Sequence, residues 1–151
     1  MEEEKSLLRW GGLAGVLAAI IFIAVQMPLF VLFPPPETPE GFPDVRAALA
    51  AGTALAMAYA FLSIALVLGL SRALRGTGLA AALFGGVLGV LGFVVTALGD
   101  ASYFVASAPI SDLYHAAGVT PEEQATLVLM WQATQGLTNT FFFVGTLFLM
   151  I

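Results

Sequence analysis

The sequence has no cysteine and only one histidine among its 151 residues. Without cysteine there can be no disulfide, no thiolate metal site, no covalent haem attachment and no cysteine nucleophile. A single histidine also leaves little with which to hold haem or zinc. The sequence therefore implies no cofactor.

Charge is equally scarce, because only 10% of the residues are charged, whereas soluble domains contain about a quarter. Ten acidic residues oppose five basic ones, which gives a net charge of −5. No basic patch is present, so nucleic acid is excluded as a partner and strong binding to anionic headgroups is not expected. With 60% hydrophobic residues and a mean hydropathy of +0.97, the chain is expected to be a polytopic membrane protein whose first partner is the lipid bilayer.

Four apolar stretches are long enough to cross a hydrocarbon core about 30 Å thick. They cover about residues 7–33, 45–70, 77–106 and 121–151, and they are separated by 34–44, 71–76 and 107–120. We expect an all-α fold that forms one transmembrane domain, with four helices in an antiparallel up-down bundle. The first stretch is too long for the apolar part of a signal peptide and is interpreted as a retained anchor.

Local sequence patterns predict where several helices bend, begin or end. Pro28 should bend the first helix, since it has no N–H to donate, and Asp44 is a candidate N-cap for the second. Pro109 is expected to end the third helix. Thr120 and Glu123 have the spacing of a capping box at the start of the fourth. The last residues are apolar without a polar flank, which favours a longer chain or a partner at that end.

The distribution of basic residues predicts the orientation. Lys5, Arg9, Arg72 and Arg75 lie near the first helix start and in the 71–76 connection, whereas the other two connections share only Arg46. By the positive-inside rule, both termini and the 71–76 connection are cytoplasmic, and the acidic loops lie outside the cell membrane.

Small residues recur at alternating four- and three-residue intervals along the third helix. They are Gly78, Ala82, Gly85, Gly89, Gly92, Thr96 and Gly99. This row of small residues, which we call the lane, lets a neighbouring helix approach closely. We expect the second helix to pack against the lane with Ala47, Ala51, Ala54 and Ala58. These faces support the leading hypothesis, a non-enzymatic membrane subunit or accessory protein that packs against other membrane helices in a homo- or hetero-oligomer.

A second hypothesis comes from polar residues inside the apolar stretches. Gln132, Gln135 and Asn139 share one face of the fourth helix, which either hydrogen-bonds to neighbouring helices or lines a ligand site. Gln26, Arg46, Asp100 and Gln132 lie in the outer half of the four helices and could form an outward-facing pocket of a small transporter or ligand-binding protein. The alternative for Arg46 and Asp100 is a structural ion pair.

Asp112 and His115 are weak candidates for a metal site, since they lack a second nitrogen or sulfur ligand, and a solvated acidic loop is the simpler interpretation. No catalytic motif is present, so no catalytic residue is assigned. The Arg-containing connection, the Gly-rich third helix, the GDASYF and TPEEQ segments and the polar fourth helix together resemble small uncharacterised bacterial multi-pass membrane proteins, known only as families of unknown function. The resemblance implies no activity.

Overall fold

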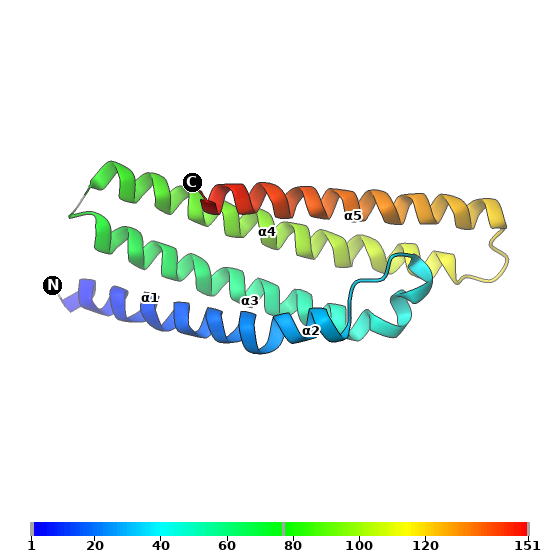
Figure 1. The fold of residues 1–151 in the computed structure, drawn as a ribbon, viewed down its shortest axis with the longest axis horizontal. Helices are drawn as coiled ribbons and strands as arrows, with labels where there is room; N and C mark the ends of the chain where they lie inside the picture. The colour runs from blue at the N-terminus through cyan, green and yellow to red at the C-terminus, as the bar shows by residue number, and fades with distance from the viewer. Residues whose placement is uncertain (1, 77, 151) are drawn as a thin grey trace.

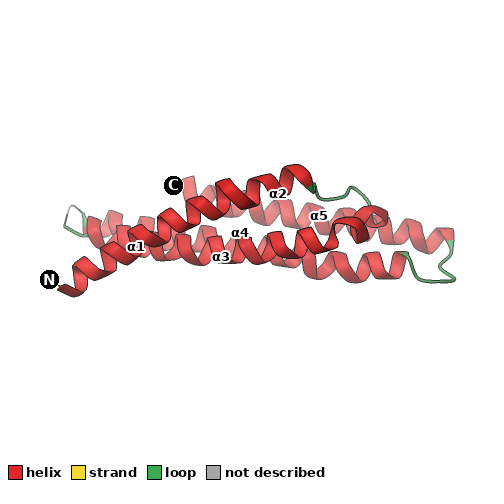
Figure 2. Ribbon diagram, turned by 90° about the horizontal axis from the view of Figure 1, so that it is seen from below, coloured by secondary structure: helices red, strands yellow, loops and turns green. Residues whose placement is uncertain are grey.

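The computed structural model describes residues 2–76 and 78–150, the side chains of residues 2–4 excepted, and contains no β-strand among them. The long helices are α1 (Glu2–Ile20), α3 (Phe42–Leu74), α4 (Leu79–Tyr114) and α5 (Pro121–Met150). A π-helical turn, Ile21–Gln26, joins α1 to the short helix α2 (Met27–Leu32), and a 3-10 turn, Pro39–Gly41, precedes α3. Figure 2 shows the α4–α5 connection at one end of the molecule, whereas the loop after α2 lies further in.

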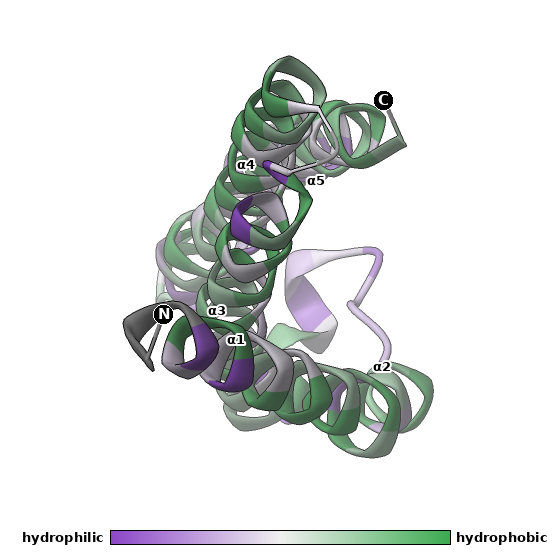
Figure 3. Ribbon diagram, turned by 90° about the vertical axis from the view of Figure 1, so that its left-hand side faces the viewer, coloured by the Kyte–Doolittle hydropathy of each residue, from purple (hydrophilic) through white to green (hydrophobic). Residues whose placement is uncertain are grey.

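The helices form an open, curved row rather than a closed bundle. Helix α1 packs on α3, α3 on α4 and α4 on α5, whereas the described part of α5 does not run along α1, α2 or α3 and meets α3 at the start of that helix, where the Trp131 ring contacts the Phe42 ring. Viewed end-on, the row is an arc, and the segment between α2 and α3 lies on its inner side (Figure 3). We call this inner side the concave face. We call the end with the α3–α4 connection proximal and the end with the α4–α5 connection distal (Figure 1).

Within the described part of the chain, three helical segments are long and apolar enough to cross a membrane. They are Lys5–Leu32, Pro39–Leu74 and Leu79–Tyr114. The expected all-α fold is confirmed, and these three segments are compatible with the expected membrane protein. Helix α5 does not belong to this group because Gln124, Gln132, Gln135 and Asn139 interrupt its apolar residues.

Two predicted helix ends are wrong. Helix α3 starts at Phe42 with Gly41 as its N-cap, so Asp44 lies in the first turn and is not the cap. Helix α4 continues through Pro109 to Tyr114. A proline in a helix leaves the carbonyl four residues earlier unpaired. Pro109 and Val105 are both on the exposed side, where that carbonyl is not enclosed by another helix.

The predicted capping box of α5 is confirmed. The Thr120 N–H donates to Glu123 Oε2 at 2.8 Å, and the Glu123 N–H donates to Thr120 Oγ1 at 3.3 Å. This reciprocal pair satisfies two backbone donors at the helix start. Gly118, with φ of 86°, turns the chain just before it.

Glycines form two close crossings in the row. A Cβ built on Gly92 of α4 would lie 2.8 Å from the Gly145 carbonyl oxygen of α5, and one built on Gly145 would lie 2.8 Å from the Gly92 carbonyl oxygen. Similarly, a Cβ on Gly11 of α1 would lie 3.2 Å from the Cα of Gly69 on α3. At both crossings one backbone rests against another, as small residues allow in membranes.

The lane along α4 contacts two neighbouring helices, α3 and α5, instead of one. Ala82, Gly89, Gly92 and Gly99 are buried and Thr96 is half-buried, but Gly89 faces Val67 of α3, whereas Gly92 and Gly99 face α5. Gly89 and Gly92 are three residues apart, which places them about 60° apart around the helix axis, so the two edges of the lane face different helices.

Two members of the lane do not pack at all. Gly85 is exposed, and Gly78 lies just before the first residue of α4. The partner stripe predicted on α3 is also wrong, because Ala47, Ala51 and Ala54 are exposed. The buried residues of α3 belong to another face, with Ala56, Ala60 and Ser63.

Among the described residues, the large apolar side chains that are buried gather at the distal end. Phe42, Ile110, Leu127 and Trp131 form this core, with Phe42 and Trp131 fully buried. Elsewhere the buried apolar residues are mainly alanines of α1, α3 and α4. The distal end is therefore packed like a protein interior, and the remaining helix contacts are packed like those of membrane helices.

Candidate functional site: a cavity on the concave face

The concave face contains a cavity of about 730 Å³. Its walls come from the π-helical turn, α2, α3, α4 and α5, together with Pro35 and Glu37 of the segment before α3. Pockets that hold small ligands typically measure about 300–1,000 Å³. The cavity is therefore large enough for a small organic molecule.

The π-helical turn places Gln26 in the cavity wall. Ala18 and Gln26 are eight residues apart, which in a regular α-helix would put them about 80° apart around the axis. The turn contains one extra residue, shown by the Met27 N–H bonding to the Phe22 carbonyl five residues earlier, and this brings both residues to the buried side. The Gln26 side chain is only 6% exposed, and its Oε1 has no partner within the described structure.

Four of the six predicted pocket residues line this cavity. Asp100 comes from α4, Gln135 and Asn139 come from α5, and Gln26 comes from the π-helical turn. Gln135 is half-buried, and its Nε2 donates to the Pro36 carbonyl oxygen at 2.8 Å. Thr53, Thr96 and Thr138 add hydroxyl groups to the same wall.

The other two predicted residues lie elsewhere. Gln132 is exposed and does not line the cavity, so the face that it was expected to share with Gln135 and Asn139 lies only partly on the cavity. Arg46 does not pair with Asp100. It forms an exposed ion pair with Asp112, with Arg46 Nη1 at 2.7 Å from Asp112 Oδ1.

This ion pair also weakens the predicted metal site. Asp112 is engaged by Arg46, and the His115 Nδ1 lies 2.8 Å from the Ser111 carbonyl oxygen. Within the described residues, no group of three or more His, Cys, Asp or Glu side chains is arranged to hold a metal ion.

The proline-rich segment 34–41 closes the distal end of the cavity. The Pro36 carbonyl oxygen accepts from Trp131 Nε1 at 3.2 Å as well as from Gln135, so the segment is attached to α5. The Pro39 carbonyl oxygen accepts from Ser111 Oγ of α4 at 2.9 Å. The segment thereby bridges the open side of the row between α2 and the α4–α5 pair.

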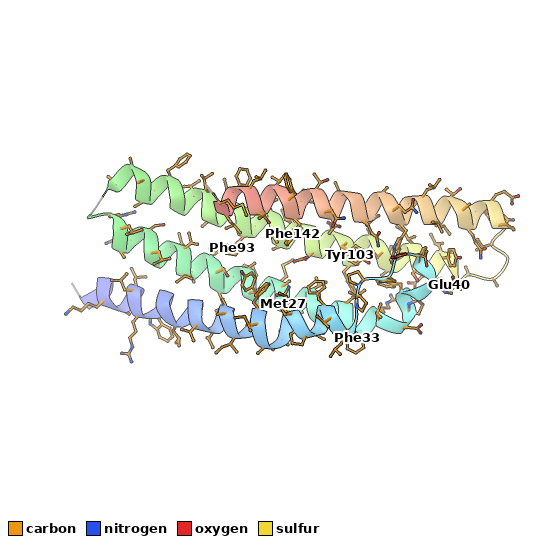
Figure 4. The ribbon with its side chains drawn as sticks, in the orientation of Figure 1. Met27, Phe33, Glu40, Phe93, Tyr103 and Phe142 are labelled. Carbon is orange, nitrogen blue, oxygen red and sulfur yellow. The ribbon has the colours of Figure 1, made fainter. Side chains whose placement is uncertain are left out.

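Aromatic rings line the inner wall. Tyr59 of α3 lies between Phe22, with ring centroids 5.3 Å apart, and Phe93 of α4, with centroids 5.7 Å apart. Figure 4 shows the lining side chains Met27, Phe33, Phe93, Tyr103 and Phe142, which come from both sides of the row. Most of the wall is therefore apolar, with polar groups at separate points.

The side of the cavity between α2 and α5 is open. The backbones of the described parts of the two helices do not lie side by side. Phe30 of α2 and Phe142 of α5 line the cavity and yet are 45% and 58% exposed. Apolar side chains thus flank this open side of the cavity.

No family model matches this chain, and no match was found among curated proteins or solved structures. The cavity itself is therefore the main evidence on function. Sequence reasoning identified the polar positions but missed the aromatic wall and the π-helical turn. Phe22, Tyr59 and Phe93 look like ordinary apolar residues in sequence, and only the proline at position 28 indicated an irregular helix there.

Proposed function

We propose that this chain is an integral membrane protein that binds a hydrophobic or amphiphilic small molecule in the concave cavity. The observation that carries the proposal is a 730 Å³ apolar cavity with Gln26, Asp100, Gln135 and Asn139 on its wall and a lateral opening between α2 and α5. Large apolar cavities with a few convergent polar groups are the usual form of a ligand site.

The proposal includes a placement in the cell membrane. A helix of 36 residues, such as α4, is about 54 Å long and exceeds a hydrocarbon core of about 30 Å. We place the proximal end, with exposed Arg9, Arg72 and Arg75, on the cytoplasmic side. Asp100 lies about 20 residues after the start of α4, and this distance along the helix places it near the outer boundary of the bilayer.

This placement explains why the distal core and the remaining helix contacts are packed differently, because each part would lie in a different solvent. The distal core of Phe42, Ile110, Leu127 and Trp131 would lie beyond the hydrocarbon, where water drives the burial of large apolar side chains. Alanine and glycine contacts would lie within the lipid, where close backbone approach stabilises helix pairs. Helix α5 would enter the same layer beside α4 as a fourth membrane helix, with Gly145 against Gly92.

Filling the cavity tests the proposed function. Gly52 lines the cavity, and a Cβ added there would meet no atom within 4 Å. Gly52→Phe should therefore occupy the cavity without displacing a helix. Gly12→Phe is the matched control, because Gly12 is exposed on α1, outside the cavity, and an added Cβ also meets nothing.

The readout is saturable binding of N-phenyl-1-naphthylamine, an uncharged fluorophore, to protein in lipid nanodiscs. We expect saturable binding by wild type and by Gly12→Phe, and loss of the saturable component in Gly52→Phe. Equal binding by Gly52→Phe and wild type would contradict a ligand site in this cavity.

A role in assembly with other membrane helices is the second candidate. It is favoured by the exposed small-residue stripe of Ala47, Ala51 and Ala54 on α3, which none of the described helices covers. Small residues on an exposed helix face permit close packing of another helix. A single monomeric species in mild detergent, without any associated protein, would count against this candidate.

A further inference from the structure

The charges around the cavity are of one sign. Asp100 and Glu37 line it, whereas none of the described Lys, Arg or His residues does. Arg46, the nearest basic residue along α3, is paired with Asp112. An anionic ligand such as a fatty acid would therefore face two carboxylates without a compensating cation.

Asp100 itself lacks a protein partner in the part of the chain that the structure describes. It is half-buried, and no hydrogen bond or ion pair to its carboxylate is formed by the described residues. A carboxylate near hydrocarbon is costly unless it is paired. A positive charge held in the cavity would provide the missing partner.

The rest of the cavity wall also favours a positive charge. The faces of aromatic rings are negative and attract cations, and Phe22, Tyr59 and Phe93 stand together along the inner side. Gln26, nine-tenths buried, adds an amide oxygen that has no partner among the described residues. Rings, amide oxygen and carboxylate all complement a positive charge on an apolar body.

We propose that the ligand of this cavity is a lipophilic organic cation, with Asp100 as its counter-ion and the aromatic wall around its apolar part. The inference rests on the proposed function, because it names the chemical class of molecule that the same cavity binds. The cation enters from the bilayer between α2 and α5 and lies with its charge toward α4.

Two ions of nearly equal size and opposite charge test the proposal. Tetraphenylphosphonium and tetraphenylborate are titrated against wild-type protein in phosphatidylcholine nanodiscs, whose lipids carry no net charge. Binding is taken as the saturable component that Gly52→Phe removes. We expect the cation to bind at least about tenfold more tightly than the anion, a difference typical of one interaction with a charged group.

Two variants of α4 test whether Asp100 is responsible for the preference for the cation over the anion. Asp100→Asn keeps the shape of the side chain and should weaken binding of tetraphenylphosphonium by about tenfold or more. Asp112→Asn removes a carboxylate from the same helix outside the cavity and should leave this binding unchanged.

The outcomes separate this inference from the function on which it rests. If Gly52→Phe removes the binding of both ions but the two bind alike, or if Asp100→Asn has no effect, the cation proposal is overturned and the ligand site remains. If neither ion nor the uncharged fluorophore shows a component sensitive to Gly52→Phe, the proposed function fails as well.

Discussion

At the scale of residues, two glycine pairs determine how closely the helices approach. Gly92 and Gly145 bring the backbones of α4 and α5 together, and Gly11 and Gly69 do the same for α1 and α3. Other glycines of the same helices face open space, among them Gly12, Gly85 and Gly136. A glycine in these helices is therefore structurally required only where a neighbouring helix lies against it.

Substitution by alanine should have opposite effects at two glycines of α5. Gly145→Ala would place a Cβ 2.8 Å from the Gly92 carbonyl oxygen, so the helices must separate, at a cost of about 1–3 kcal/mol in the free energy of unfolding. Gly136→Ala meets no atom within 4 Å and should stabilise the protein by about 0.5–1 kcal/mol, since alanine favours the helix.

Unfolding of both variants in detergent micelles, followed by circular dichroism during a denaturant titration, measures this difference. If Gly145→Ala were as stable as Gly136→Ala, the close crossing of α4 and α5 would be wrong.

Several residue-level features could be predicted from the sequence because they depend on near neighbours in the chain. The capping box needs only Thr120 and Glu123, three residues apart. Gln135 and Asn139 share a face of any helix that contains both. In contrast, the pairing of Arg46 with Asp112 rather than Asp100 depends on the offset between α3 and α4, which no local pattern specifies.

At the scale of elements, the helices are longer than the membrane requires. Helix α4 continues past Pro109, and α3 begins three residues before the expected start at position 45. A hydropathy pattern marks where the lipid-compatible part ends, not where the helix ends. The extra turns contribute Phe42 and Ile110 to the distal core, and the added turns of α4 also contain Ser111, whose hydroxyl binds the Pro39 carbonyl oxygen of the proline-rich segment.

The proposed crossing of α4 can be tested because the protein has no native cysteine. Arg75→Cys lies before α4 and Glu122→Cys follows it, and both positions are exposed. With a membrane-impermeant maleimide added to intact cells, we expect labelling of Glu122→Cys, and labelling of Arg75→Cys only after the membrane is opened, because basic connections stay inside. Labelling of both variants in intact cells would contradict the proposed topology.

At the scale of the whole molecule, the open row is what creates the cavity. A closed four-helix bundle would bring α5 against α1 and fill the space with side chains. Among the described residues α5 runs along α4 but not along α1, α2 or α3, and the gap is spanned by the segment 34–41 and, at the distal end, by the contact of Phe42 with Trp131. The sequence predicted the helices and the antiparallel order of neighbours. Whether the first and last helices touch depends on contacts between distant parts of the chain, which the periodicity of the sequence does not specify.

The cavity is the central claim, and the most direct measurement compares two cysteine variants of α3. Thr53→Cys and Ser63→Cys replace hydroxyl side chains of similar size on one helix. Thr53 lines the cavity, whereas Ser63 does not line it and is only 3% exposed, packed between helices. The measurement is the rate of reaction with N-ethylmaleimide, a small uncharged reagent, in nanodiscs.

If the cavity exists, Thr53→Cys reacts readily and the reaction is slowed by a cavity ligand such as tetraphenylphosphonium, while Ser63→Cys stays unreactive until the protein unfolds. If the two variants react at the same slow rate, the helices close over the concave face and the existence of the cavity is contradicted.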